Sequence, residues 1–274
     1  MNIRVDISNI QHWVEDQMIR GRYMFTKQDV LDLGLPIKEV SVNRSLQRLE
    51  TKGTIMSPWQ NFYVAVATEY RLKGVVPPSF YIDRLMAFLG RDYYVSHLSA
   101  AALNGASHQM AMVFQTMVNG GPIRSGVKNG TKLEFTLRRN LPLEFTHKVK
   151  TKSGYMTVAD AELTALDIVA ESNKVGGLSR AAELLVELCE QTRWDESRLP
   201  LLKYFSVANI QRLGFILDLI KEHEKADSLY LLMKQTDKTV RKVPLKQTAT
   251  VADDMPVDER WKVIENYELE IDEL

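Results

Sequence analysis

The chain has 274 residues, of which 35 are acidic and 35 are lysine or arginine, so the net charge by itself predicts no particular partner. Hydrophobic residues make up 45% of the chain, which is enough for a buried core and excludes a globally disordered protein, and the length favours two domains. A single cysteine, Cys189, excludes an intrachain disulfide and a thiolate metal cluster and fits a reducing compartment.

The N-terminus has no apolar signal-peptide core, and no stretch approaches the ~20 apolar residues of a membrane span, so we expect a cytoplasmic protein.

The sequence of residues 1–78 predicts a small N-terminal domain that begins with two helices. Four apolar residues at helical spacing indicate a first helix that ends at Gly21: Ile7, Ile10, Val14 and Met18. Thr26 and Asp29 have capping-box spacing and predict a second, short helix that stops at Gly34.

A third helix and a β-hairpin complete this domain. Val42, Leu46 and Leu49 fall at i, i+4 and i+7 and form an apolar seam, and Gly53 ends the helix. Two β-favouring runs follow, with the turn residues SPWQN (57–61) between them. The order of three helices and a hairpin is that of a winged helix-turn-helix, in which the third helix enters the major groove of DNA.

Polar side chains beside the apolar seam are the candidate DNA-reading residues. They are Ser41, Asn43, Arg44, Gln47 and Arg48, with Trp59, Gln60 and Asn61 at the tip of the wing. Asn and Gln can pair with adenine and Arg with guanine, so we assign the residues at 43, 44 and 47 to bases. We assign those at 41 and 48 to phosphates and the wing tip to the backbone or the minor groove. The alternative is an ordinary helix with a solvated face.

A boundary is predicted at Pro77 and Pro78, because paired prolines cannot lie inside a helix. Residues 79–274 then form a larger mixed α/β domain, and the whole chain is predicted to be α+β. Helices are expected over residues 79–90, 96–105, 160–172, 178–191 and 206–225, and strands over 109–119 and 132–139 around a Gly-rich turn at 120–130. Five residues of these helices should be buried: Leu163, Leu166, Ile168, Leu213 and Leu217.

Catalytic chemistry finds little support in the sequence. The five histidines show no close metal-ligand spacing, and we find no nucleophile elbow, P-loop or dinucleotide fingerprint. The run GGLSR is better explained as a turn that leads to Ser179 as a helix N-cap than as a phosphate loop. Cys189 is expected to be a buried helical thiol. We therefore predict that the chain is not an enzyme, with no catalytic residue, no metal and no cofactor.

Local charge is more informative than net charge. Between residues 121 and 152, eight lysines and arginines stand against two glutamates, whereas the tail from Asp253 is strongly acidic. The candidates for auxiliary phosphate or partner contacts are Arg124, Lys128, Lys132, Arg138 and Arg139. Two alternatives remain open, namely that basic strand edges prevent edge-to-edge pairing or that the acidic tail folds back on them.

Several segments, taken in order, resemble the AbiEi family of bacterial abortive-infection antitoxins. They are the N-terminal winged helix, YYVSHLSAAALNG (93–105), TVADAELTALDIVA with GGLSRAAELLVEL (157–188), IQRLGFILDL (210–219) and the terminal DERWKVIENYELEIDEL. The resemblance covers nearly the whole chain and depends on the joint order of these segments.

The resemblance implies an antitoxin of a toxin–antitoxin system that gives phage resistance. The N-terminal domain would bind inverted repeats in the operon promoter, as two copies, and would repress its own operon. The larger domain would neutralise a cognate nucleotidyltransferase toxin without a lasting complex. Double-stranded promoter DNA and this toxin are therefore the expected partners, and no membrane is implied.

Two other classes of function remain as alternatives. The chain could be a transcription factor whose larger domain senses a small ligand, and a neighbouring toxin gene would separate that function from the antitoxin. It could also be a nucleic-acid-processing enzyme that docks through the winged helix, which a clustered acid pair or histidine site would favour.

Overall fold

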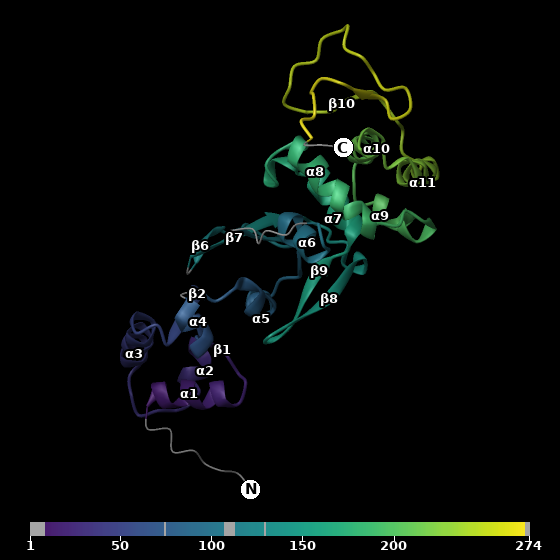
Figure 1. The fold of residues 1–274 in the computed structure, drawn as a ribbon. Helices are drawn as coiled ribbons and strands as arrows, with labels where there is room; N and C mark the ends of the chain where they lie inside the picture. Colours follow the sequence, from purple (N-terminus) through teal and green to yellow (C-terminus); the bar gives the residue numbers. More distant parts are fainter. Residues whose placement is uncertain (1–8, 74, 107–112, 129, 272–274) are drawn as a thin grey trace. The chain divides into compact units, whose positions relative to one another are not determined.

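The computed structural model describes residues 9–73, 75–106, 113–128 and 130–271 (Figure 1). The chain divides into two compact units. The first consists of Met1–Asp92, Ile123–Glu134 and Val149–Met156, and the second of Tyr93–Pro122, Phe135–Lys148 and Thr157–Leu274. Residues 79–92 therefore group with the first unit, and independent folding of residues 79–274 stays a prediction. The mixture of helices and sheets confirms the α+β class.

Three helices and a three-stranded sheet open the first unit. They are α1 (Ile10–Ile19), β1 (Met24–Thr26), α2 (Lys27–Leu31), α3 (Glu39–Thr51), β2 (Ile55–Trp59) and β3 (Phe62–Ala65). The sheet is antiparallel with the order β1-β3-β2. Strand β1 was not predicted, because three residues are too few to show an alternating pattern.

The caps of the first two helices follow from the sequence. The expected start of the first helix, residues 6–8, lies outside the described residues, and the side chain of Asn9 caps α1. The Thr26 hydroxyl accepts a hydrogen bond from the Asp29 amide at 3.1 Å, and the Asp29 carboxylate accepts one from the Thr26 amide at 2.6 Å. These bonds confirm the capping box. Helix α2 ends at Leu31, earlier than expected.

The apolar seam of α3 forms part of the core of the first unit. Val42, Leu46 and Leu49 are buried, as predicted, and cluster with α1 residues that include Ile10 and Val14. Trp13 of α1 packs edge-to-face on Phe25 of β1, with ring centroids 5.2 Å apart. The seam therefore fixes which face of α3 is left for solvent.

The β2–β3 hairpin has a shorter turn than predicted. Ser57 and Trp59 belong to β2, and the turn itself is Gln60–Asn61. Asn61 has φ of 62°, a left-handed conformation that asparagine tolerates better than most residues. The Ser57 hydroxyl donates a hydrogen bond to the carbonyl of Trp59 at 2.8 Å, just before the turn.

Short helical elements follow the hairpin. They are α4 (Thr68–Lys73), the 3-10 turn η1 (Pro78–Phe80) and α5 (Ile82–Phe88). Pro77 is the extended residue before η1 and Pro78 is its first residue, so the proline pair initiates a 3-10 turn. The helix expected over residues 79–90 is therefore shorter and begins at Ile82.

A six-stranded sheet has the order β6-β7-β5-β4-β9-β8. Its strands are β4 (Tyr93–Val95), β5 (Val113–Val118), β6 (Gly126–Lys128), β7 (Thr131–Leu137), β8 (Thr146–Thr151) and β9 (Gly154–Ala159). Strand β4 is antiparallel to β5 and parallel to β9. The expected strands at β5 and β7 are present, although residues 109–112 lie outside the described residues. The predicted Gly-rich turn contains β6, and β4, β8 and β9 were missed.

Helices account for most of the second unit. The α-helices are α6 (His97–Leu103), α7 (Ala161–Ala170), α8 (Leu178–Leu188), α9 (Leu199–Leu202), α10 (Val207–Leu219) and α11 (His223–Lys234), and the 3-10 turns are η2 (Leu143–Phe145), η3 (Ser172–Lys174), η4 (Cys189–Gln191) and η5 (Glu196–Arg198). The five leucine and isoleucine side chains predicted to be buried on α7 and α10 are at most 1% exposed. No helix in the described residues is long and apolar enough to cross a membrane.

Two details of these helices differ from the sequence prediction. The single helix expected over residues 206–225 is wrong, because the chain turns after Leu219 with Lys221 at φ of 67° and continues as α11. Ser179 is not the N-cap of α8. Gly177, with φ of 110°, occupies that position, and the Ser179 hydroxyl instead accepts a hydrogen bond from the Glu270 amide at 3.2 Å.

The acidic C-terminal segment, drawn in yellow in Figure 1, packs on the helices of its own unit. Its strands β10 (Val243–Pro244) and β11 (Val263–Ile264) form a parallel pair. Trp261 is fully buried over Gly214 of α10, where an added Cβ would lie 2.1 Å from the indole ring. The indole nitrogen donates to Asp218 at 2.7 Å. A glycine in mid-helix is therefore required to seat the tryptophan.

Candidate functional site

The outward face of α3 carries the predicted DNA-reading residues. All five of them, Ser41, Asn43, Arg44, Gln47 and Arg48, are exposed. Within the described part of the chain, none of their side chains makes a hydrogen bond or an ion pair. Their hydrogen-bonding groups are therefore available to a ligand.

The angular positions of these residues follow from helix geometry, at about 100° per residue. Arg44 lies at the centre of the exposed face, opposite the buried seam, and Gln47 and Arg48 lie about equally far from that centre on opposite sides. Asn43 and Ser41 lie farther out, on opposite flanks of the face. Helix geometry thus favours Arg44 for a base contact but places Asn43, also assigned to a base, beside the seam. The division between base and phosphate contacts stays a prediction.

Charge at the start of α3 is balanced within the unit. The Lys27 ammonium lies 2.5 Å from the carboxylate of Glu39, which is in the first turn of the helix. The acidic side chain is favourable at this end of the helix dipole. The ion pair also reduces the repulsion that Glu39 would exert on an approaching phosphate.

The wing-tip candidates lie at the β2–β3 turn. Gln60 and Asn61 are exposed and form the turn itself, whereas Trp59 is half-buried at the end of β2. Strand β2 packs against α3, so the hairpin and the helix share one unit. A hairpin with a two-residue turn offers only these exposed side chains at its tip.

The basic candidates are divided between the two units. Arg124, Lys128 and Lys132 belong to the first unit, and Arg138 and Arg139 belong to the second. Arg124, Lys132 and Arg139 are exposed, and Lys128 lies in β6. The Lys132 ammonium lies 3.5 Å from Glu134 of the same strand, which reduces its net attraction for a phosphate.

Arg138 is held by internal partners. Its guanidinium donates to Asp167 at 2.8 Å, to the Tyr94 hydroxyl at 3.1 Å and to the Tyr204 carbonyl at 2.9 Å, and it lies over the ring of Phe205. Burial raises the pKa of Asp167 to about 7, and Arg138 offsets part of that increase. Three of the five N–H donors of Arg138 are therefore used inside the unit, so Arg138 is a poorer candidate for a phosphate contact than the exposed Arg139.

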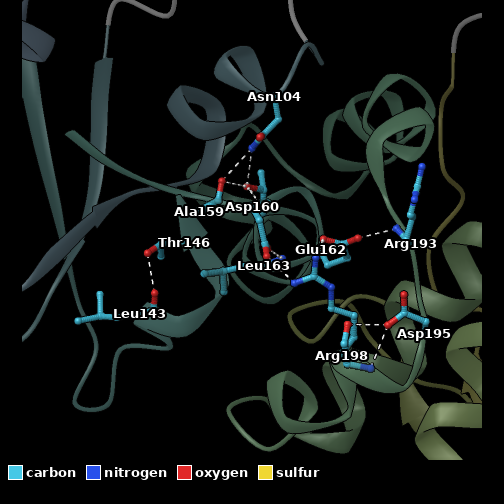
Figure 2. Close-up of polar contacts among 12 residues, drawn as sticks. Asn104, Leu143, Thr146, Ala159, Asp160, Glu162, Leu163, Arg193, Asp195 and Arg198 are labelled. Carbon is cyan, nitrogen blue, oxygen red and sulfur yellow. Dashed lines mark hydrogen bonds and ion pairs between the residues drawn. The ribbon is translucent and has the colours of Figure 1, made fainter. Parts of the chain in front are cut away.

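A polar pocket of about 530 Å³ lies in the second unit, and Figure 2 shows the polar contacts of several residues that line it. Arg198 of η5 bridges two carboxylates there, Asp160 at 2.6 Å and Glu162 at 3.0 Å. Asp160 also caps α7 by accepting from the Leu163 amide at 2.9 Å, and Glu162 accepts from the Arg193 amide at 2.5 Å. Each carboxylate oxygen of this pair thus has a partner.

The environment of this pocket favours a structural role for the acid pair. Burial raises the pKa of Asp160 and Glu162, and Arg198 together with backbone amides offsets part of that increase. The network connects the start of α7 to η5, and each of the four carboxylate oxygens of the pair has a partner within it. His147 and Arg193 line the pocket and are exposed.

Two other side chains that could act as a nucleophile, a base or a metal ligand, Cys189 and His97, are buried. Burial raises the pKa of the Cys189 thiol to about 12, which agrees with the predicted buried thiol, although the residue lies in η4 just after α8. His97 is buried and its Nδ1 lies 2.8 Å from the Ser96 hydroxyl. His108 lies outside the described residues. Among the residues that the structure describes, no group of three or more metal-ligating side chains is placed to hold an ion.

Comparisons with known proteins found one family model and a similar solved structure. Residues 94–219 match the family model of the AbiEi antitoxin C-terminal domain. The crystal structure of the RV2827C protein from Mycobacterium tuberculosis is similar with a TM-score of 0.65 at 12% identity, over 92% of this chain and 89% of that one. At this identity the likeness shows the fold alone. A comparison with curated proteins found no match.

Proposed function

We propose that the chain is an antitoxin that also represses its own operon, because residues 94–219 match the family model of the AbiEi antitoxin C-terminal domain. The family match is the observation that carries the antitoxin role. We propose that the toxin it counteracts is a nucleotidyltransferase, as the family resemblance of the sequence implies, and that the chain itself is not an enzyme.

We propose that the N-terminal part, residues 1–78, is a winged helix-turn-helix that binds DNA. The support is the order α1, β1, α2, α3 and the β2–β3 hairpin, with a three-stranded sheet in the order β1-β3-β2. The outward face of α3 adds five exposed polar side chains that no other described group engages. A helix that is merely exposed to solvent would not require the preceding helices, the hairpin and the polar outward face to occur together.

Repression through promoter inverted repeats implies two copies of the chain on one operator. Their α3 helices would then lie about 34 Å apart, one turn of DNA, or a multiple of that distance. Arg124, Lys128, Lys132 and Arg139 would supply additional phosphate contacts, which raise affinity without adding sequence preference.

One experiment tests both halves of this proposal. The full chain is co-expressed with the neighbouring open reading frame, and growth is scored beside a reporter driven by the operon promoter. An antitoxin restores growth, and a repressor lowers the reporter signal. Restored growth with an unchanged reporter would support neutralisation and contradict autorepression. Unrestored growth at normal expression of the chain would contradict the antitoxin role.

A further inference from the structure

Val40 is an exposed aliphatic side chain on the outward face of α3. It is 58% exposed, whereas the other aliphatic residues of this helix are buried in the seam. Val40, Arg44 and Gln47 fall at i, i+4 and i+7, so Val40 lies at the centre of the face that the seam leaves to solvent. A β-branched residue there gains nothing from packing and has a lower helix propensity than a straight-chain polar residue.

The major groove offers one apolar group that such a side chain can recognise. Among the bases, only thymine presents a methyl group at that edge. The N-terminal residues of a reading helix contact base edges, and Val40 is the second residue of α3. We infer that Val40 contacts the 5-methyl group of a thymine and so specifies a T·A pair in each half-site. This inference rests on the proposed DNA-binding function.

The position of Val40 also constrains where that thymine lies. Val40 precedes Arg44 by about one helical turn, or about 6 Å along the helix. Base pairs are about 3.4 Å apart. The thymine should therefore lie one or two base pairs from the base that Arg44 contacts. A protein partner fits this face less well, because a stable interface buries roughly 800 Å² on each side, and a single valine among polar residues supplies little of the apolar core.

The test uses uracil, which differs from thymine only by the absence of the methyl group. Operator sites are first selected from random duplexes with the full chain, and each thymine of one half-site is then replaced by uracil. The dissociation constant is measured at fixed salt. At one thymine position, uracil should weaken binding by about fourfold, the factor that corresponds to burying one methyl group.

Val40→Ala supplies the decisive comparison. This variant should bind the unmodified site more weakly and should no longer respond to uracil at that position. Val251→Ala is the matched control, because Val251 is an exposed valine of the other unit, and it should keep the uracil profile of the parent chain. Alanine favours a helix, so the thermal midpoint of the Val40 variant should not fall.

The outcomes separate this inference from the function on which it rests. If Val40→Ala shows the same uracil profile as the parent chain, the methyl contact is wrong and DNA binding by α3 still stands. If the parent chain selects no sequence at all, the DNA-binding function fails, and the inference fails with it.

Discussion

The polar groups of Arg44 and Asn43 on α3 have no side-chain partner among the residues that the structure describes, so truncation tests them with little effect on folding. Arg44→Ala or Asn43→Ala should weaken operator binding by about 1–3 kcal/mol and relax the preference at one base position in each half-site. Arg48→Ala should weaken binding to all duplexes about equally, because a phosphate contact carries no sequence information. Affinities for operator and scrambled DNA, measured at one salt concentration, check both expectations. Parent-like operator binding by both base-contact variants would show that α3 does not read DNA.

Asp167 gives the stability of the second unit a predictable pH dependence. Its pKa is raised from 3.8 to about 7 in the folded chain, so the folded state holds more protons than the unfolded state between about pH 4 and pH 7. The free energy of unfolding contributed by this site should therefore fall as the pH rises through that window. The pKa difference corresponds to about 4 kcal/mol in total, at about 1.4 kcal/mol per pKa unit.

Chemical denaturation at several pH values checks this dependence. Asp167→Asn removes the titrating group, so the decrease between pH 4.5 and 7.5 should become shallower. Asp237→Asn is the control, because Asp237 is exposed, and it should keep the slope of the parent chain. Equal slopes in all three proteins would contradict the prediction.

The site residues differ in how far the sequence can place them. The face of α3 could be predicted because the buried seam and the helical period fix it locally. Arg138 could not, because its partners Asp167 and Tyr94 are 29 and 44 residues away in the chain. Val40 was missed because an isolated apolar residue between polar neighbours is easily dismissed as a chance exposure.

At the scale of elements, helices with caps and an apolar stripe could be predicted, and short strands could not. The strand β4 is three buried residues without alternation, and β8 reads as a charged, polar run. The break between α10 and α11 was missed because the apolar stripe continues through Ile220 and no glycine or proline marks the turn. Lys221 adopts the left-handed conformation because the surrounding packing of α11 on α10 determines it.

Helix α7 packs on α6, α8 and α10 in the second unit, and the burial of its leucine side chains can be tested by truncation. Leu166 is 0% exposed, so Leu166→Ala should lower the free energy of unfolding by about 2–5 kcal/mol through lost burial and a residual cavity. Leu231→Ala is the matched control, because Leu231 of α11 is 62% exposed and its truncation should change stability by less than about 0.5 kcal/mol. Denaturant midpoints measure both effects. An unchanged midpoint for Leu166→Ala would show that α7 is misplaced.

At the scale of the whole molecule, point substitutions should separate the two proposed functions, toxin neutralisation and promoter repression. Because residues 79–92 and two β-segments group with the first unit, deleting residues 1–78 would remove much of a shared core. Arg44→Ala in the full chain should lose promoter repression and keep toxin rescue at matched expression. Loss of rescue by a folded Arg44→Ala protein would show that the two activities are not divided between the units.

The basic residues should act on all DNA alike. Arg139→Glu should weaken specific and random duplexes equally and should reduce the slope of affinity against salt by about one counterion. Lys242→Glu makes the same charge change at another exposed position and should have a smaller effect. Titrations at several salt concentrations compare the two. A parent-like salt slope for Arg139→Glu would point to a structural or toxin-facing role.

The packing of Trp261 on Gly214 has a consequence for folding during synthesis of the chain. The chain leaves the ribosome from its N-terminus, so α10 emerges before the tryptophan that covers it. At about 5–20 residues per second, synthesis of the 47 residues from Phe215 to Trp261 takes roughly 2–9 seconds. During that interval the indole ring that covers Gly214 in the folded chain is not yet available. The packing of α10 at Gly214 is therefore completed only after Trp261 has been synthesised.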